Sequence, residues 1–296
     1  MPTRFISSAT KLLLLGLKRA SFLAAVDLSK IMTDNTETLL NLPGLLPFFP
    51  TKAVEPSRVS SLIRRLHPVT CGHSLIRLGS SDDGGYLVPD DLAGIEACFS
   101  PGVSDRSAFE LDCARMGMDV FMADASVDRP SLAHPRFQFI KKHIGANTVD
   151  RFVSLEDWVR NAFDRPNAEL LLQMDIEGYE YEALLSTPSS LLKQFRIIIV
   201  EFHYLDYMFS EPLFAIYSQV FTRLLNTHTC VHIHPNNVCP PITISTVQIP
   251  QIAEFTFLRT DRVVNPRFVT TFPHPLDCDN TNDVSRTLPN CLYHAQ

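Results

Sequence analysis

The fold of this chain is decided by one stretch, Leu170-Leu-Leu-Gln-Met-Asp-Ile-Glu-Gly-Tyr-Glu-Tyr-Glu-Ala-Leu184. Its first five residues are almost all apolar, which indicates a strand buried on both faces of a parallel sheet. Gly178 permits a sharp turn, and a helical pattern resumes after it. Asp175 and Glu177 therefore fall at the carboxyl end of the strand, where open α/β sheets bind ligands. A simpler interpretation, in which Asp175 only caps the following helix, stays open.

Short apolar runs alternate with helical stretches from about Arg77 onward, which is typical of βαβ units and a mostly parallel sheet. Strands are predicted at Ala97–Ser100, Val120–Ala123, Phe137–Ile140, Leu170–Met174, Ile197–Phe202, Cys230–His234 and Phe255–Arg259. Helices are predicted at Ser107–Met116, Leu155–Phe163, Tyr179–Leu185 and Leu213–Asn226. The connection between the last two strands holds several prolines and no long helical pattern, so we expect the final strand to run antiparallel.

Composition and charge narrow the class of protein. A chain of 296 residues with 45% hydrophobic content can bury a sizeable core. The formal net charge of −6 argues against nucleic acid as a partner. The seven cysteines are widely spaced and include no Cys-x-x-Cys pair, which argues against both a disulfide framework and a zinc knuckle. We therefore expect a cytoplasmic protein.

The amino-terminal region differs from the rest of the chain. Its apolar runs are broken by Lys18 and Arg19, so none reaches transmembrane length and a secretion signal is disfavoured. Three prolines between residues 42 and 50 rule out a continuous helix there. We expect a helical extension and linker over residues 1–70, and one main domain over residues 71–296. Residues 1–50 could contact a membrane surface, the domain itself or a second subunit.

The end of the first predicted sheet strand indicates a cofactor site. Gly102 lets backbone N–H groups approach the charged end of a cofactor, as in other first βα turns. Asp124 ends the next strand about twenty residues later, where a carboxylate can accept hydrogen bonds from both hydroxyls of a ribose. The full G-x-G-x-x-G pattern is absent, so an ordinary turn is the alternative.

Two further strands end in polar residues. Glu201 and His203 follow one apolar run, and His203 is either a hydrogen-bonded core residue or a general base. His232 and His234 alternate along another strand and so share a face. They could bind a metal or a substrate, but no third ligand is identifiable, and no metal centre is predicted.

The segment Asp82-Asp-Gly-Gly-Tyr86 precedes the first strand of the sheet. Asp-Gly-Gly is foremost a turn signal, so a plain hairpin is the simplest interpretation. The functional interpretation is a lid whose glycines approach a cofactor and whose Tyr86 closes over it.

In this order, these segments resemble the FkbM-type branch of the class I S-adenosylmethionine-dependent methyltransferases. The resemblance covers roughly residues 75–296 and rests on Asp83-Gly-Gly-Tyr86, Gly102 with Glu110, Asp124, Val153-Ser-Leu-Glu-Asp-Trp158, Met174-Asp-Ile-Glu-Gly-Tyr-Glu180, Ile199-Val-Glu-Phe-His203, His232-Ile-His-Pro-Asn-Asn237 and Phe272-Pro-His-Pro-Leu-Asp277. It implies a Rossmann-like α/β fold with a seven-stranded, mostly parallel sheet, an antiparallel last strand and helices on both faces.

The same resemblance implies the site residues and the reaction. S-adenosylmethionine would be bound by Ser100, Pro101, Gly102, Val103, Glu110, Asp124, Ala125, Gly145, Asp175 and Tyr86. Methyl transfer to a hydroxyl depends mostly on alignment, with a base that takes the proton. Asp175 and His203 are the candidate bases, and Glu177 and Glu201 would orient them or bind substrate. The expected acceptor is a hydroxyl of a sugar or glycan, or of a secondary metabolite.

Three other interpretations fit part of the pattern. The fold could serve binding or assembly without catalysis. A nicotinamide-dependent oxidoreductase would share the glycine turn, but it would need a fuller phosphate-binding loop. A divalent cation could also assist the transfer, with Asp175, Glu201 and His203 as conceivable ligands, although no cation is expected.

Overall fold

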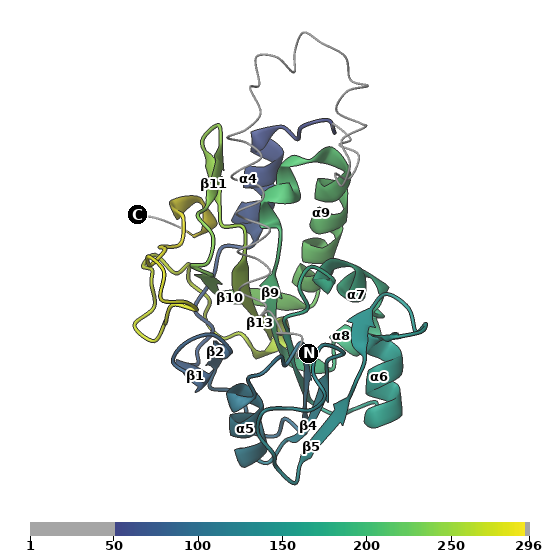
Figure 1. Cartoon of the computed structure of the whole chain (residues 1–296). Helices are drawn as coiled ribbons and strands as arrows, with labels where there is room; N and C mark the ends of the chain where they lie inside the picture. Colours follow the sequence, from purple (N-terminus) through teal and green to yellow (C-terminus); the bar gives the residue numbers. More distant parts are fainter. Residues whose placement is uncertain (1–50, 294–296) are drawn as a thin grey trace. The chain divides into compact units, whose positions relative to one another are not determined.

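The computed structural model of the chain describes residues 51–293 (Figure 1). The contacts predicted for residues 1–50, with a membrane surface or a second subunit, lie outside the described residues, as does most of the predicted helical extension. In the described part of the chain, no helix combines the length and the apolar character that a membrane crossing requires.

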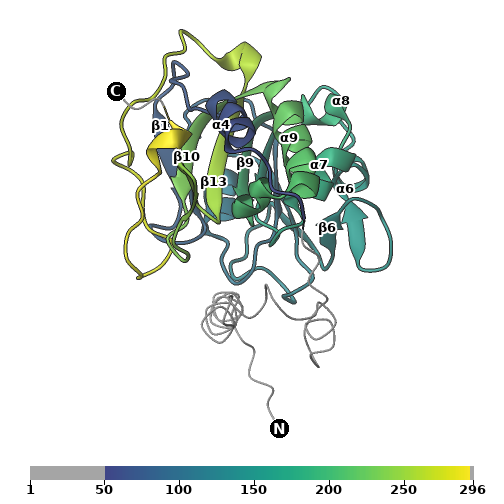
Figure 2. The same cartoon turned by 90° about the horizontal axis from the view of Figure 1, so that it is seen from above.

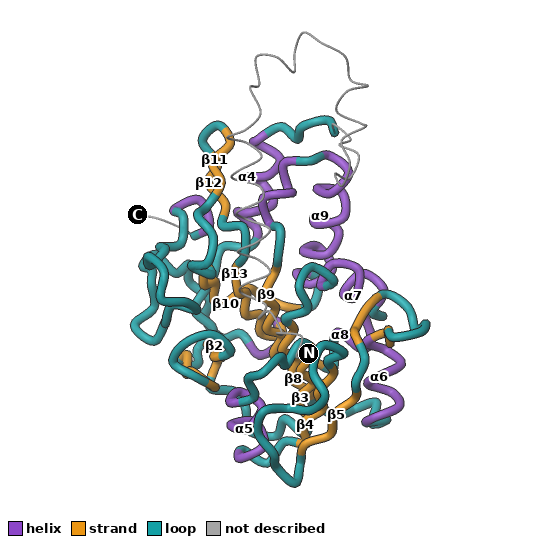
Figure 3. Tube along the Cα trace, in the orientation of Figure 1, coloured by secondary structure: helices purple, strands orange, loops and turns teal. Residues whose placement is uncertain are grey.

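A seven-stranded sheet forms the centre of the described unit, and its strands follow the order β10-β13-β9-β8-β3-β4-β5 (Figure 3). The strands are β3 (Ala97–Pro101), β4 (Asp119–Ala123), β5 (Phe137–Ile140), β8 (Leu170–Met174), β9 (Phe195–Phe202), β10 (His228–Pro235) and β13 (Ala253–Arg259). Strand β13 runs antiparallel to both of its neighbours, and the other pairs are parallel. The predicted strands and the antiparallel final strand are confirmed.

Two hydrophobic cores lie on the two faces of this sheet. One face is covered by α4 (Pro56–Arg65), α6 (Leu155–Ala162), α7 (Glu180–Ser186), α8 (Ser189–Leu192) and α9 (Glu211–Leu225) (Figure 2). The other face is covered by α5 (Ala108–Arg115) and by an antiparallel hairpin of β1 (Leu75–Gly79) and β2 (Gly85–Pro89). Along β9, Ile198 packs with the helices and Ile199 with the hairpin side. Burial on both faces explains the unbroken apolar runs in the sequence.

The predicted helices form within about two residues of their expected bounds. Helix α6 begins at the predicted cap, where the Ser154 side chain accepts a hydrogen bond of 3.1 Å from the backbone N–H of Asp157. That contact satisfies one of the amide groups left unpaired at a helix start. The Asp82–Gly85 turn joins β1 to β2, which confirms the hairpin.

Several short elements have no periodic signal in the sequence. Strand β6 (His143–Gly145) pairs with β7 (Phe152–Ser154), and β11 (Ile242–Ile244) pairs with β12 (Val247–Ile249). Three short 3₁₀ helices complete the described chain: η1 (Leu205–Phe209), η2 (Thr260–Arg262) and η3 (Asn290–Leu292). A pattern of three residues is too short to separate strand from loop.

Helix α4 belongs to the main unit, although it precedes the boundary predicted at residue 71. Its Val59, Leu62 and Ile63 are buried in the same core as the helix-covered face of the sheet. Its Arg58 also pairs with Glu211 of α9, with 2.6 Å between Nη1 and Oε2. The compact unit begins at Lys52. The compact unit therefore includes α4, whereas the alternation of strands and helices in the sequence begins only after it.

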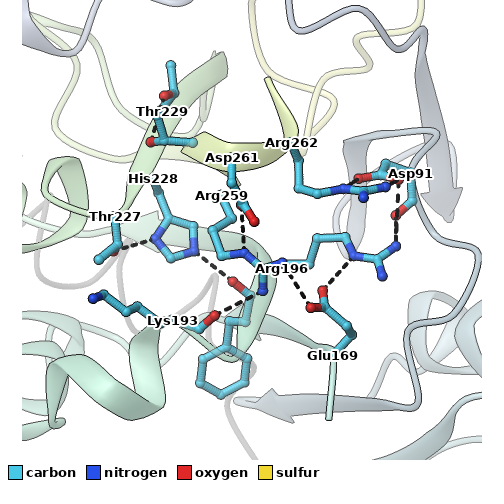
Figure 4. Close-up of polar contacts among 12 residues, drawn as sticks. Asp91, Glu169, Lys193, Arg196, Thr227, His228, Thr229, Arg259, Asp261 and Arg262 are labelled. Atoms are coloured by element: carbon cyan, nitrogen blue, oxygen red, sulfur yellow. Dashed lines mark hydrogen bonds and ion pairs between the residues drawn. The ribbon is translucent and has the colours of Figure 1, made fainter. Parts of the chain in front are cut away.

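Ion pairs join the amino ends of the parallel strands, and Arg196 and Asp91 are the buried members of this network (Figure 4). Arg196, at the start of β9, lies 2.7 Å from Glu169 and 3.6 Å from Asp91. Arg259, at the end of β13, lies 2.8 Å from the same Glu169. Arg262 donates to Asp91 at 2.8 Å. Burial would raise the pKa of Asp91, but the two arginines hold it below its usual value. This network holds together the amino ends of the parallel strands, at the end of the sheet opposite their carboxyl ends.

Candidate active site

Three strand ends meet at Gly102, directly after β3. Its backbone has a φ of +90°, and its N–H donates to the carbonyl of Ala123 at 3.0 Å. The backbone N–H of Asp175 donates to the carbonyl of Pro101 at 3.2 Å. A Cβ atom at Gly102 would lie only 1.5 Å from the carbonyl oxygen of Asp175. Only glycine fits here, because both the backbone conformation and the contact exclude a side chain.

Asp124 holds the loop that follows Gly102. Its Oδ2 accepts from the backbone N–H of Ser104 at 2.8 Å, and its Oδ1 accepts from that of Ser126 at 2.7 Å. The residue is 7% exposed, and the adjoining Ala125 is also buried. The predicted ribose ligand therefore lies beside the glycine turn, with both oxygens bonded to backbone. Each carboxylate oxygen keeps a second acceptor site.

A cleft opens between this loop, the β1–β2 hairpin and α5. It is lined by Asp83, Gly84, Tyr86, Gly102, Val103, Ser104, Asp105, Arg106, Glu110, Gln173 and Asp175. Arg106 joins the loop to the hairpin, since it pairs with Asp82 at 2.8 Å and donates to the carbonyl of Asp83 at 2.8 Å. The hairpin turn is thus one wall of the cleft. Five predicted cofactor residues meet there: Tyr86, Gly102, Val103, Glu110 and Asp175.

The other predicted cofactor residues do not line this cleft. Ser100 and Pro101 are buried behind it in β3. Gly145 lies in β6, where an added Cβ would be 2.9 Å from the Phe152 ring and 3.1 Å from a Glu182 oxygen. Gly145 therefore packs against α7 and β7.

A chain of polar side chains runs beneath the cleft. Ser100 donates to Glu110 and lies 2.6 Å from Oε1 of Gln173, whose Nε2 donates to the Tyr86 hydroxyl at 3.0 Å. Burial raises the pKa of Glu110 to about 7, and the Ser100 hydroxyl opposes that rise. Gln173 is not among the site residues predicted from the sequence. Its signal is that it is the single polar residue of an otherwise apolar strand.

A buried polar row crosses the hairpin-covered face of the sheet. Glu254 of β13 lies directly opposite Glu201 of β9 and His234 of β10 in the two antiparallel registers. All three are 5% exposed or less. Asn236 donates to Glu201 at 2.6 Å, and Asn280 donates to Glu254 at 2.8 Å. Burial raises the pKa of Glu254 to about 8, despite His234 nearby.

Asp175 connects this row to the cleft. It is hydrogen-bonded to Glu201 and lines the cleft with its own side chain. Burial, and then the charge of Glu201, raise the pKa of Asp175 well above its usual value. Two carboxyls this close hold one proton between them, because their charges repel.

His203 lies among further carboxylates. Its Nδ1 is 3.1 Å from Glu180, and its Nε2 is 3.6 Å from Glu177 and 3.9 Å from Asp175. Burial alone would lower the pKa of His203, but Glu180, Asp175 and Glu201 raise it well above its usual value. The ligand atoms of Asp175, Glu180 and His203 all lie within 4.8 Å of one another, so these residues could hold a metal ion.

Glu180 ends the Met174–Glu180 segment that carries the family resemblance, but no site role was predicted for it. It is fully buried, and its Oε1 accepts from the backbone N–H groups of Ile176 and Gly178 at 3.1 and 3.0 Å. The four residues predicted as catalytic are Asp175, Glu177, Glu201 and His203. The structure brings them together around Asp175.

His232 and His234 share a strand face, as predicted, and both contact Asp277. The Oδ1 atom of Asp277 lies 2.8 Å from Nε2 of His232 and 3.7 Å from Nδ1 of His234. Burial would raise the pKa of Asp277, but the two histidines hold it well below its usual range. The sequence did not identify a third residue beside these two histidines. In the structure this residue is Asp277, which belongs to the carboxyl-terminal segment.

Comparison with protein families agrees with this arrangement. A family model described as the methyltransferase FkbM domain matches residues 101–226. The match extends from the last residue of β3, through Asp175 and His203, to the end of α9. No curated protein matches the chain. Residues 101–226 thus match the FkbM-type methyltransferase family, which confirms the resemblance predicted from the sequence.

Proposed function

We propose that this protein transfers a methyl group from S-adenosylmethionine to a hydroxyl group of a sugar or glycan, or of a secondary metabolite. The family match supports methyl transfer. The observation that carries the cofactor is the cleft in which the Gly102 turn meets Asp175 at the carboxyl ends of β3 and β8. Open α/β sheets bind their ligands at such strand ends.

The residues around the cleft fit the charge pattern of the cofactor. The methionine end of S-adenosylmethionine carries an ammonium and a carboxylate. The cleft offers carboxylates at Asp83 and Asp175, and a guanidinium at Arg106. Asp124 would accept from the ribose hydroxyls through the acceptor sites that the backbone leaves open. When bound, the cofactor supplies a methyl group activated by a positively charged sulfur.

The chain's own residues would bind the acceptor and receive its proton. Asp175 faces the cleft, and the Asp175–Glu201 pair holds one proton and can accept a second. His203 is less suited to be the base, because its carboxylate neighbours keep it protonated. We therefore propose Asp175 as the base that takes the proton of the acceptor, and His203 as the residue that orients Asp175. Asn236 and Asn280 donate hydrogen bonds to Glu201 and Glu254 and so hold the buried polar row in place beside Asp175.

Calorimetry with three ligands tests the cofactor. The full chain is titrated with S-adenosylmethionine, S-adenosylhomocysteine and, as the control, a nicotinamide dinucleotide. We expect saturable binding of the first two and none of the third. If the folded protein binds none of the three ligands, a binding or assembly role without catalysis would be favoured. Binding of the dinucleotide alone would favour an oxidoreductase.

A further inference from the structure

The buried ring of His203 presents its two nitrogen atoms to different carboxylates. Nδ1 lies 3.1 Å from Oε1 of Glu180. Nε2 lies 3.6 Å from Oε2 of Glu177 and 3.9 Å from Oδ1 of Asp175. Both of the latter distances exceed hydrogen-bond length. The side chain of His203 is only 5% exposed. One edge of a nearly buried ring thus points toward two carboxylate oxygens without a hydrogen bond to either.

These separations match those between ligands of a single metal ion. Atoms that lie about 2.1 Å from a common ion are roughly 3 to 4 Å apart, depending on the angle between them. Oδ1 of Asp175 is also buried and has no hydrogen-bond partner within residues 51–293. We infer that Nε2 of His203, Oδ1 of Asp175 and Oε2 of Glu177 form a binding site for a divalent cation.

Glu180 is the positioning residue of this site. It is fully buried, and the backbone N–H groups of Ile176 and Gly178 fix its Oε1. It can accept the Nδ1–H of His203, and the cation would then take the place of the proton on Nε2. Histidines that bind metals usually donate their other ring N–H to such a carboxylate, and the loss of that partner weakens binding about 10- to 100-fold.

The local charge also favours a cation. Within the described residues, no lysine or arginine pairs with Asp175, Glu180 or Glu201. His203 is the neighbouring cationic group, and a divalent ion would add further positive charge beside these buried carboxylates. One imidazole nitrogen with carboxylate oxygens suits Mn²⁺, Fe²⁺ or Zn²⁺ better than Mg²⁺, which prefers oxygen ligands alone.

The proposed ligand set has Glu177 in place of the Glu201 that the sequence suggested. Sequence reasoning named Asp175, Glu201 and His203 as conceivable ligands of a cation. In the structure Glu201 is bonded to Asn236 at 2.6 Å, whereas Glu177 approaches His203 from the loop after β8. The site lies beside the cleft because Asp175 belongs to both. A role in binding the acceptor oxygen would rest on the proposed function, whereas binding of the cation does not.

In the test, the metal-stripped full chain is titrated with Mn²⁺. Electron paramagnetic resonance measures the concentration of the free ion at each step. We expect about one tightly bound Mn²⁺ per chain. Glu177→Gln should weaken binding at least about tenfold without unfolding the protein, because the side chain is 51% exposed. Glu182→Gln, an exposed glutamate of α7, is the matched control and should stay within about twofold of the parent.

Two further variants make the outcome decisive. His203→Gln should abolish specific binding, with circular dichroism as the check on folding. In Glu180→Gln, ¹⁵N resonances of His203 should lose the preference for the Nδ1–H tautomer in the metal-bound protein. Absence of saturable Mn²⁺ binding, or equal affinity in the parent, Glu177→Gln and His203→Gln, would overturn the site. S-adenosylhomocysteine binding to the same samples reports separately on the proposed cofactor site.

Discussion

Gly102 and Asp175 are in backbone contact across the carboxyl ends of β3 and β8: a Cβ on Gly102 would lie 1.5 Å from the carbonyl oxygen of Asp175. This contact sets the floor of the cleft and the position of the proposed base. The backbone at Gly102 is also in the left-handed region, with a φ of +90°. The glycine turn and the acidic loop are therefore one structural unit.

Gly102→Ala should disrupt that unit. We expect a loss of about 3 kcal/mol or more in the free energy of unfolding, because backbone strain and overlap add. Gly117→Ala is the matched control: its φ is +97°, but nothing lies within 4 Å of an added Cβ. That variant should lose only about 1 kcal/mol. Urea denaturation of both proteins measures the difference, and equal losses would contradict the contact.

Asp124→Ala should weaken the binding of S-adenosylmethionine at least about tenfold, because Ser104 and Ser126 lose their common acceptor and the ribose loses its own. The control is Asp128→Ala, a change at a 90% exposed carboxylate on the same loop, which should stay within about twofold. Calorimetry measures both affinities. If Asp124→Ala binds like the parent, the ribose is placed wrongly.

Glu110 should make stability depend on pH. Its pKa is raised from 4.5 to about 7 in the folded protein, so its contribution is complete below about pH 4.5 and is lost as the pH rises through 7. The difference corresponds to about 3 kcal/mol. Glu110→Gln should remove this part of the pH dependence. Urea denaturation from pH 5 to 8 compares the two proteins, and parallel curves would contradict the raised pKa.

Arg196→Met should destabilise the sheet at the amino ends of its parallel strands. The change leaves the buried Asp91 and the half-buried Glu169 without one of their cations, which should lower the free energy of unfolding by about 3 kcal/mol. Arg115→Met, at a side chain that is 66% exposed, should change it by less than about 0.5 kcal/mol. Thermal unfolding measures both. Cofactor affinity should be unchanged in each, since the network lies away from the cleft.

The sheet was predictable from the sequence because its strands are buried on both faces. Residues such as Ile197–Val200 therefore form unbroken apolar runs, and the proline-rich connection before β13 favoured its antiparallel direction. Helix α4 was not placed, since only tertiary packing assigns it to the core. The short pairs β6–β7 and β11–β12 carry too few residues for a periodic signal.

The site was predictable only where a polar residue ends a strand. Asp175 and His203 stand out in the sequence for that reason. Glu254 and Asn280 do not, because their role depends on strand register and on a distant loop. The position of Glu180 in the Met174–Glu180 segment predicted no site role, since a glutamate in the first turn of a helix is ordinary. Its importance comes from burial and from the histidine that it contacts.

Hydrogen–deuterium exchange with and without S-adenosylhomocysteine tests the central claim most directly. We predict that the ligand slows exchange in peptides that contain residues 100–106 and 173–178, which enclose the cleft. Peptides of α4, which packs in the helix-covered core, should not change. Protection at both cleft segments would place the cofactor where Gly102 meets Asp175. Protection confined to other segments, or none at saturating ligand, would contradict the proposed site.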